Sequence, residues 1–227
     1  MILRSAPCGP LEANCYIVAA EEGGDCVIID PGVEAAGWVK GLLCELQVTP
    51  VAILATHGHF DHAGDAGTLG SHYGIPTWIH SLDQPMLHDP GLGLDPMFAA
   101  WVTKIYQGGG FPPPERVEVL DGREKLEVAG LSFTIIHAPG HTEGGVLYRL
   151  DDPKLGTLVF TGDVLFAGAI GRTDLPVGSP AAMKETLTGV VLNLPDSARI
   201  LPGHGPDSTI ERERATNPYL TSRFLAG

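Results

Sequence analysis

The most informative segment of the chain is Thr56-His57-Gly58-His59-Phe60-Asp61-His62, which directly follows the apolar run 51–55. An extended backbone alternates its side chains, so His57, His59 and Asp61 share one face. Asp61 and His62 are sequence neighbours, and only a turn lets both approach a second point. This dense group of imidazoles and a carboxylate predicts metal binding. We expect His57 and His59 to face one cation, and Asp61 and His62 to face another.

Three further candidate ligands lie just beyond apolar runs in the second half of the chain, each beside a glycine. His141 follows a Pro-Gly pair, Asp163 follows Thr-Gly, and His204 follows Pro-Gly. A strand that ends in this way delivers a polar side chain to the edge of a sheet. Because the same pattern recurs three times, we expect these residues to share one site with the first four.

The chemistry of these side chains sorts them into two metal sites with one common ligand. His141 can join the first pair of ligands, and His204 can join the second pair. Asp163 has two carboxylate oxygens and can bridge two cations, which offsets the repulsion between ions held ~3.5–4 Å apart. We therefore predict two divalent ions, with zinc favoured and iron or manganese left open. The predicted ligands are His57, His59, Asp61, His62, His141, Asp163 and His204.

The composition is typical of a globular protein and excludes two classes of partner. Hydrophobic residues make up 44% of the 227 residues, which is ample for a full core. The formal net charge is −13, from 27 acidic and 14 basic residues, and no basic patch is seen. Polyanionic nucleic acids and anionic membrane surfaces are therefore disfavoured. We expect a small-molecule substrate, and the pattern leaves the oligomeric state open.

The N-terminus and the cysteines predict a cytoplasmic protein. The first residues show no basic start followed by a long apolar segment, so no signal peptide is expected. No apolar run approaches the ~18 residues of a membrane span. The four cysteines fit no CxxC pattern; they are Cys8, Cys15, Cys26 and Cys44. We expect buried free thiols in a reducing compartment rather than disulfides.

Residue periodicity predicts strands followed by a helix in both halves of the chain. In the first half, β-rich runs precede a helix with an apolar stripe over residues 35–46. In the second half, β-rich runs between 124 and 161 precede a helix over 181–192. This order favours an α/β (α+β) protein with two mixed sheets and helices outside. We predict a four-layer αββα sandwich that forms a single domain over residues 1–227.

Two segments depart from this simple pattern. Residues 83–116 are rich in glycine and proline around one helical patch, Met97 to Tyr106. A long segment of this kind in a compact domain is more often functional than a connector, so we expect an inserted lid or substrate loop. Residues 210–215 predict a short helix of mixed charge with a solvated face.

The motifs, taken in order, resemble those of the metallo-β-lactamase superfamily over nearly the whole chain. They are THGHFDH at 56–62, PGH at 139–141, TGD at 161–163 and PGHG at 202–205. Asn14-Cys15-Tyr16 and the run LFAGAIGRTDLP at 165–176 resemble the short glyoxalase II-like branch, also called hydroxyacylglutathione hydrolases. The resemblance implies an αββα fold with a binuclear site at its edge, and hydrolysis of a thioester of the S-lactoyl type. The C-terminal helical domain that contacts glutathione in long members is not expected, so another small thiol carrier is left open.

A two-metal site suits the hydrolysis of a thioester by a metal-bound hydroxide. Two metals lower the pKa of bound water toward ~7 and stabilise the oxyanion. We expect Asp61 both to bind metal and to orient the hydroxide. A thiol with a pKa near ~8.5 can leave as thiolate without a strong general acid, which suits motifs that hold no free acid.

Three other functions compete with this one. A persulfide dioxygenase of the same superfamily resembles the chain around 171–174, but it uses a single iron at the positions of His57, His141 and Asp163. The filled second set of ligands favours a hydrolase. A β-lactamase is less favoured because no export signal is seen. A non-catalytic binding protein is disfavoured because all seven ligand positions are filled.

The segment Gly171-Arg172-Thr173-Asp174 begins eight residues after Asp163. We expect Arg172 and Asp174 either to brace the loops that carry the metal ligands or to form a salt-bridged turn. The sequence favours neither alternative.

Overall fold

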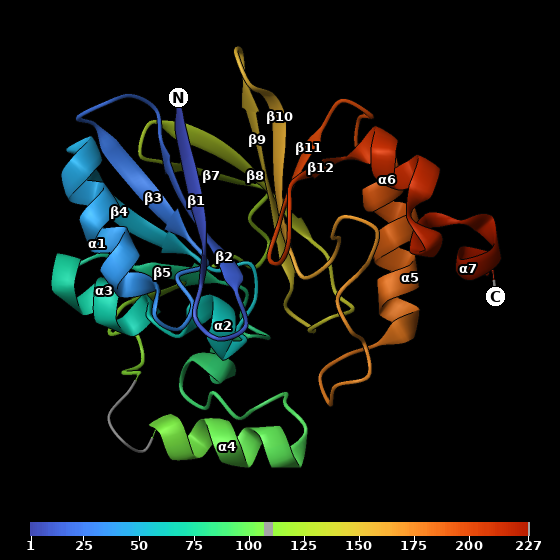
Figure 1. The fold of residues 1–227 in the computed structure, drawn as a ribbon, viewed down its shortest axis with the longest axis horizontal. Helices are drawn as coiled ribbons and strands as arrows, with labels where there is room; N and C mark the ends of the chain where they lie inside the picture. The colour runs from blue at the N-terminus through green and yellow to red at the C-terminus, as the bar shows by residue number, and fades with distance from the viewer. Residues whose placement is uncertain (107–110, 227) are drawn as a thin grey trace.

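The computed structural model describes residues 1–106 and 111–226. They form two six-stranded sheets packed face to face, with helices on both outer sides (Figure 1). This arrangement confirms the predicted αββα sandwich. The first sheet has the spatial order β1-β2-β3-β4-β5-β6, with β1 (Ile2–Cys8), β2 (Ala13–Ala19), β3 (Asp25–Ile29), β4 (Thr49–Leu54), β5 (Thr77–Ile79) and β6 (Val117–Val119).

The second sheet is built from the other half of the chain and has the order β12-β11-β10-β9-β8-β7. In this second sheet, β10 and β11 pair in parallel and the other pairs are antiparallel. In the first sheet, β3 to β6 pair in parallel. Both sheets are therefore mixed, as predicted. The strands are β7 (Lys125–Val128), β8 (Leu131–His137), β9 (Val146–Asp152), β10 (Gly156–Gly162), β11 (Arg199–Pro202) and β12 (Ser208–Thr209).

Helices cover the outer face of each sheet. The first sheet carries α1 (Ala35–Leu46) and α3 (Ala66–Tyr73), and the second carries α5 (Pro180–Gly189) and α6 (Ile210–Thr216) (Figure 1). One helix, α4 (Pro96–Tyr106), stands away from both layers below the shared edge of the sheets. The shorter helices are α2 (Phe60–Ala63), α7 (Ser222–Ala226) and the 3-10 turns η1 (Gln84–Leu87), η2 (Val191–Asn193) and η3 (Pro218–Leu220).

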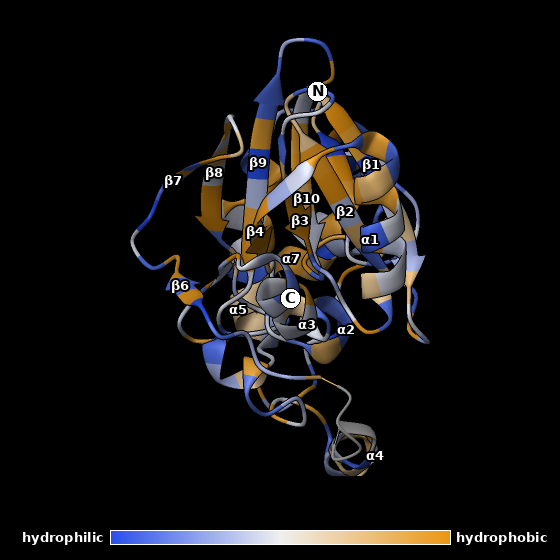
Figure 2. Cartoon of the chain, turned by 90° about the vertical axis from the view of Figure 1, so that its left-hand side faces the viewer, coloured by the Kyte–Doolittle hydropathy of each residue, from blue (hydrophilic) through white to orange (hydrophobic). Residues whose placement is uncertain are grey.

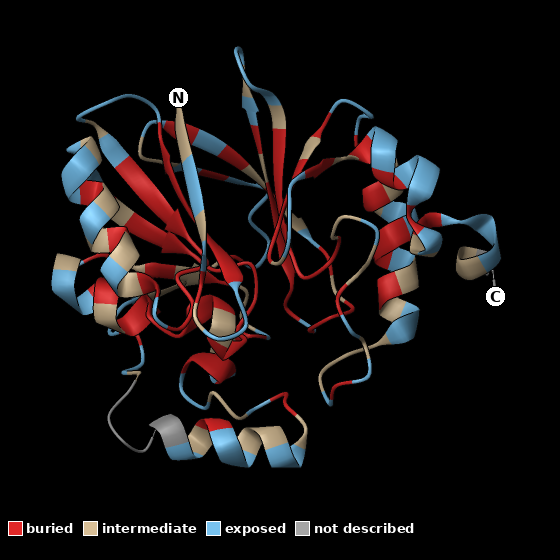
Figure 3. Cartoon of the chain, viewed as in Figure 1, coloured by how far each residue is buried: buried red, intermediate tan, exposed pale blue. Residues whose placement is uncertain are grey.

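Large apolar side chains fill the space between the sheets. Tyr16 and Leu54 of the first sheet meet Phe133, Tyr148 and Phe160 of the second, and all five are nearly inaccessible to solvent. Inner strands such as β2, β3 and β10 are predominantly hydrophobic in Figure 2 and mostly buried in Figure 3. Burying each such side chain stabilises the fold by about 1.5–3 kcal/mol. This core fixes the two sheets against each other and so fixes the edge that they share.

Four strands that precede candidate ligands end at this shared edge. In the first sheet, β4 runs parallel to β3 and leads into residues 56–62. In the second sheet, β8 and β10 are each antiparallel to β9, and β10 is parallel to β11. The carboxyl ends of β8, β10 and β11 therefore lie on one side. The topology brings 56–62, His141, Asp163 and His204 together.

Some expectations from the sequence need correction. Strand β1 was not predicted, because its sequence contains Arg4 and Pro7; it pairs only with β2, and a sheet edge tolerates proline. The helix expected over 181–192 ends at Gly189 and continues as η2. The face of α6 is not wholly solvated, because Glu213 is fully buried. The expected helical patch from Met97 is present as α4, and residues 107–110 of the predicted loop 83–116 lie outside the described residues.

The cysteines carry no disulfide, as expected. Cys8, Cys15 and Cys26 are buried, but Cys44 on α1 is exposed, which corrects the expectation that all four are buried. Among the residues that the structure describes, no helix is long and apolar enough to cross a membrane.

Candidate metal centre

The segment after β4 turns into the short helix α2, and this turn separates its ligands into two groups. His59 keeps an extended backbone and caps the helix, whereas Asp61 and His62 lie within it. Gly58 is required for close approach to the neighbouring turn. A Cβ at Gly58 would lie 2.6 Å from the carbonyl oxygen of Asp83. The segment therefore packs tightly while it presents side chains in two directions.

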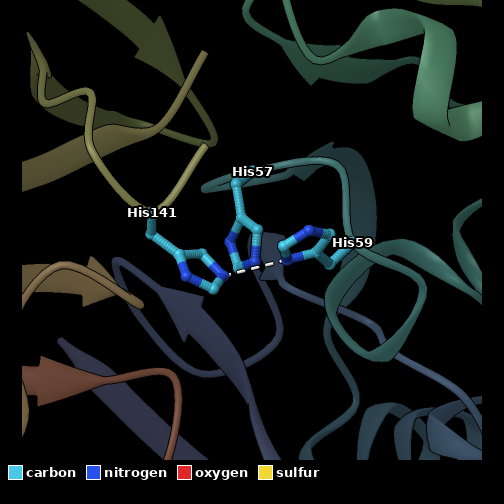
Figure 4. A group of neighbouring side chains, drawn as sticks. All are labelled: His57, His59 and His141. Atoms are coloured by element: carbon cyan, nitrogen blue, oxygen red, sulfur yellow. Dashed lines mark hydrogen bonds between the residues drawn. The ribbon is translucent and has the colours of Figure 1, made fainter. Parts of the chain in front are cut away.

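The first group consists of His57, His59 and His141, whose rings converge in Figure 4. His59 Nδ1 and His141 Nε2 are 2.9 Å apart, and the His57 ring centroid lies 4.9 Å from each of the other two. All three side chains are buried. One ligand atom from each lies within 4.8 Å of the others, so this group could hold one metal ion.

The second group consists of Asp61, His62 and His204. His62 Nε2 lies 3.3 Å from His204 Nε2 and 3.5 Å from Asp61 Oδ2. His204 Nε2 lies 3.3 Å from the same oxygen of Asp61. These three residues also form a group that could hold a metal ion. The structure thus brings together the residues that we assigned to the second site.

Asp163 lies between the two groups. Its Oδ1 is 3.3 Å from His62 Nε2, and its Oδ2 is 3.4 Å from His141 Nε2. One carboxylate therefore reaches a member of each group with a different oxygen. The neighbouring Gly203 keeps this space open, because a Cβ there would lie 2.3 Å from Asp163 Oδ1 and 2.6 Å from His62 Cε1.

A metal fits these donors for two reasons. Neighbouring ligand atoms in a tetrahedral zinc site with bonds of 2.0–2.1 Å are roughly 3.3 Å apart, which is close to the separations here. Within the described part of the chain, the buried atoms His57 Nε2, His59 Nε2 and Asp163 Oδ1 have no hydrogen-bond partner. Buried polar atoms without a partner are costly, and cations would satisfy them.

Asp30 orients ligands of both groups from beneath. Its carboxylate accepts hydrogen bonds from the Thr56 amide and hydroxyl at 2.7 and 2.6 Å, and it lies 3.1 Å from His62 Nδ1. The Thr56 hydroxyl in turn lies 3.1 Å from His57 Nδ1. Contacts of this kind fix the orientation of a histidine ring. Asp30 has a positive φ of 50°, a strained conformation for a residue with a side chain.

Asp83 joins the two loops that carry the first group. It is fully buried, and its carboxylate accepts hydrogen bonds from the Gly58 amide, the Thr142 hydroxyl and the Gly144 amide at 3.0, 2.7 and 2.7 Å. Gly58 lies between His57 and His59, and Thr142 directly follows His141. One side chain therefore sets the distance between the loops.

The turn that carries His204 is held in a similar way from β2. The Asn14 side chain donates to the carbonyl oxygens of Pro202 and Gly205 at 3.0 and 2.9 Å. The Tyr16 hydroxyl donates to the Pro202 oxygen at 2.7 Å. The sequence analysis assigned no role to Asp30 or to Asp83. A carboxylate placed between a β-run and a Pro-Gly pair is a signal that could have identified Asp30.

The electrostatic field differs between the two groups. Burial, followed by the repulsion of His141, lowers the pKa of His59 to about 3, and burial together with His62 lowers that of His57. Burial also disfavours the His62 cation, but Asp163, Asp61 and Asp30 outweigh it and raise its pKa to about 10. His57 and His59 are therefore neutral at pH 7, whereas His62 holds a proton until a cation displaces it.

The side chains of Arg172 and Asp174 form a salt bridge. The Arg172 guanidinium contacts Asp174 at 2.8 and 3.0 Å, and both side chains are more than half exposed. The backbone of this segment contacts the His141 ring, because His141 Nδ1 lies 2.8 Å from the carbonyl oxygen of Arg172. The segment thus supports a ligand through its main chain.

A cavity of about 790 Å³ opens over both groups. Its floor contains five of the predicted ligands, and its walls are mainly apolar. The wall residues are Leu11, Phe60, Leu94, Asp95, Met97, Phe98, Trp101, Phe166, Gly171, Arg172 and Leu175. A cavity of this size suits a small organic molecule.

Comparison with known proteins identifies the family. The family profile of the metallo-beta-lactamase superfamily matches residues 8–204. An uncharacterized protein of Mycobacterium tuberculosis is 42% identical over 97% of this chain and 98% of its own length. Hydroxyacylglutathione hydrolase GloC of Haemophilus influenzae is 33% identical over 98% of this chain and 100% of its own length.

Solved structures agree with these relatives. The B3 metallo-beta-lactamase BLEG-1 is 32% identical with a TM-score of 0.79, and TTHA1623, in a di-iron-bound form, is 35% identical with a TM-score of 0.76. Each match covers 97% of this chain and 100% of the chain in the solved structure. The chain belongs to the metallo-β-lactamase superfamily, and its fold and His/Asp groups define it as a metallo-hydrolase of that superfamily.

Proposed function

We propose that this metallo-hydrolase holds two divalent ions and cleaves a thioester of a small thiol, of the S-lactoyl type. The observation that carries the proposal is the second group of donors. Asp61, His62 and His204 have ligand atoms 3.3–3.5 Å apart, and Asp163 reaches from this group to the first. The similarity to GloC and to the di-iron-bound protein supports both parts of the proposal.

In this proposal His57, His59 and His141 would hold one ion, Asp61, His62 and His204 would hold the other, and Asp163 would serve both. Bound there, two cations would lower the pKa of water toward ~7 and polarise a carbonyl group. Zinc suits a site of imidazole and carboxylate donors, and iron or manganese would also bind.

The residues of the chain position the attacking water. Burial disfavours the Asp61 carboxylate, but the charges of His62 and His204 and the hydrogen bond from His204 hold the pKa of Asp61 below its ordinary value. Asp61 is therefore ionised at neutral pH, and it can accept a hydrogen bond from the attacking water and orient it. After the water has lost a proton to solvent, its oxygen forms a bond to the carbonyl carbon and the carbon–sulfur bond breaks. The thiol leaves as thiolate without an acid to protonate it, and the carboxylic acid that is formed releases its proton to solvent.

We further propose that residues 83–116 act as a lid or substrate loop of a single domain over 1–227, because Leu94, Phe98 and Trp101 line the cavity. A cytoplasmic location belongs to the same proposal and is supported by the four free cysteines. Cell fractionation tests the location, and recovery of the protein only from the culture medium would contradict it.

Metal analysis combined with a turnover panel tests the proposed activity. The purified protein should contain about two metal ions per chain and should hydrolyse lactoyl thioesters of several small thiols. The panel also includes glutathione persulfide with oxygen uptake, and a β-lactam because BLEG-1 is described as a metallo-β-lactamase. One iron per chain with persulfide-dependent oxygen uptake would contradict the proposal, and so would turnover of the β-lactam alone.

A further inference from the structure

A row of aromatic rings leads from the metal centre to the mouth of the cavity. Phe60 lies in the sequence between the ligands His59 and Asp61, and its ring centroid is 5.7 Å from that of Phe98 on α4. The Phe98 ring stacks on Trp101, with centroids 5.4 Å apart and planes within 9° of parallel. Phe98 and Trp101 line the cavity together with Phe60. We call these three residues the aromatic row.

The helix α4 is fixed on one side and open on the other. Val102 is buried in an apolar cluster with Val33, Phe60 and Leu94, against which Phe98 also packs. Trp101 is 46% exposed, and Met97, one helical turn before it, is 83% exposed. Both line the cavity. The packed side holds the helix in place, so the open side presents apolar surface to whatever occupies the cavity.

The charged groups of the outer wall are already paired. The Arg172 guanidinium makes two hydrogen bonds to Asp174. Asp174, and to a smaller extent Asp95, raises the pKa of Arg172. The Asp95 carboxylate accepts a hydrogen bond from the Phe98 amide at 3.0 Å, at the start of α4. Among the described wall residues outside the metal centre, no other cation lines the cavity. A substrate arm with several carboxylates would therefore lose its hydration without gaining a partner.

We infer that the aromatic row binds an uncharged, apolar arm of the substrate while the metal centre acts on the carbonyl group. This inference rests on the proposed thioester hydrolysis and specifies its substrate class. The arm can belong to the acyl group or to the thiol, since both are attached to the reacting carbonyl. Phe60 places the inner end of the row beside the ligands, and Trp101 forms its outer end.

The experiment compares thioesters that differ only in one arm. On the thiol N-acetylcysteamine, the acyl groups are lactoyl, butyryl, hexanoyl and octanoyl. A second series places the lactoyl group on ethanethiol, butanethiol, hexanethiol and glutathione. In one of the two series, kcat/KM of the metal-loaded protein should rise about fourfold per added methylene group, mainly through KM. The series that shows the rise identifies which arm the row binds.

The variant Trp101→Ala removes the outer ring without touching the metal centre. It should lower kcat/KM for the longest apolar substrate about tenfold relative to kcat/KM for the lactoyl ester of N-acetylcysteamine. Trp101→Phe should restore most of the loss. Leu155→Ala, at an exposed leucine in the turn between β9 and β10, is the matched control and should change neither value. Equal kcat/KM values along both series, or a Trp101→Ala variant that keeps the full rise, would overturn the inference.

A binding measurement separates this inference from the proposed activity. Uncleavable thioether analogues with methyl, butyl and hexyl arms are titrated into the metal-loaded protein by calorimetry. Affinity that increases with arm length in the wild type and not in Trp101→Ala supports the row even if no thioester is hydrolysed. Affinity that does not depend on arm length refutes the row even if thioesters are hydrolysed.

Discussion

The Thr142 hydroxyl donates a 2.7 Å hydrogen bond to the buried carboxylate of Asp83, and this contact joins two loops that are 59 residues apart in the sequence. The same carboxylate accepts from the Gly58 and Gly144 amides. His57 and His59 lie on the loop of Gly58, and His141 lies on the loop of Thr142 and Gly144. The geometry of the first group of ligands therefore depends on a residue that does not belong to it.

Asp83→Asn should weaken metal binding at the first site about 10- to 100-fold, as is typical when a residue that supports a ligand is lost. Each Asp83 oxygen accepts a hydrogen bond, and the amide nitrogen of asparagine cannot. One donor is therefore left unpaired, which should also cost about 1–3 kcal/mol of folding free energy. Competition with a chelator measures the affinity, and thermal unfolding of the apo-protein measures the stability. Thr142→Ser keeps the hydroxyl donor and is the control; equal chelator competition in Asp83→Asn and wild type would contradict this role.

Tyr16→Phe should affect the second site instead. The change removes the 2.7 Å hydrogen bond to the Pro202 carbonyl but keeps the ring in the core. The turn that carries His204 loses one of its anchors, so about one metal ion per chain should become easier to remove. The expected loss of folding stability is about 1 kcal/mol. Metal release is followed with a coloured chelator, and equal loosening of both ions would argue against separate supports.

Asp163→Asn should abolish thioester hydrolysis while the protein stays folded. The amide has one oxygen and no charge, so it cannot reach both groups as the carboxylate does at 3.3 and 3.4 Å. Turnover of a lactoyl thioester and circular dichroism are measured together. Turnover at the wild-type rate would remove Asp163 from the site.

Acid should release the ion of the second site before that of the first. The pKa of His62 is raised to about 10 by Asp163, Asp61 and Asp30 against the effect of burial, so below pH 10 a proton competes with the metal there. The pKa of His59 is lowered to about 3, chiefly by burial, so no such competition arises at this ligand above pH 3. Apparent affinity of the second site should fall about tenfold per pH unit per displaced proton. Metal content after dialysis at stepwise lower pH checks the order, and simultaneous loss of both ions would contradict it.

One of the four cysteines should react with a thiol reagent in the native protein. Burial raises the pKa of Cys26 to about 12 and raises those of Cys8 and Cys15 as well, whereas Cys44 is exposed. Thiolate is the reactive form, so the buried thiols should stay inert. A colorimetric thiol assay should count about one thiol per native chain and four after denaturation. Two or more fast-reacting thiols in the native protein would show that this part of the core opens readily.

Much of the fold and the candidate site follows from local features of the sequence. The candidate ligands follow directly after apolar runs with a β pattern. The strand ends and the ligands could therefore be predicted together. The spacing in THGHFDH separated its ligands into two groups, because neighbouring side chains in a strand or a turn must point apart. The N-terminal strand β1 was not predicted because its own sequence shows no clear β pattern. It is held by pairing with β2 at the edge of the sheet.

The sequence by itself determined the fold class and the set of candidate ligands, since residue type and spacing along one strand carry that information. Only the tertiary structure decided which residues support the ligands. Asn14 contacts a turn 188 residues away, and Asp30 and Asp83 reach across loops. It also decided that Phe60, Phe98 and Trp101 form one row, because helix α4 packs back against the ligand-bearing segment. Contacts between distant segments leave no local pattern, so no periodicity in the chain could have revealed them.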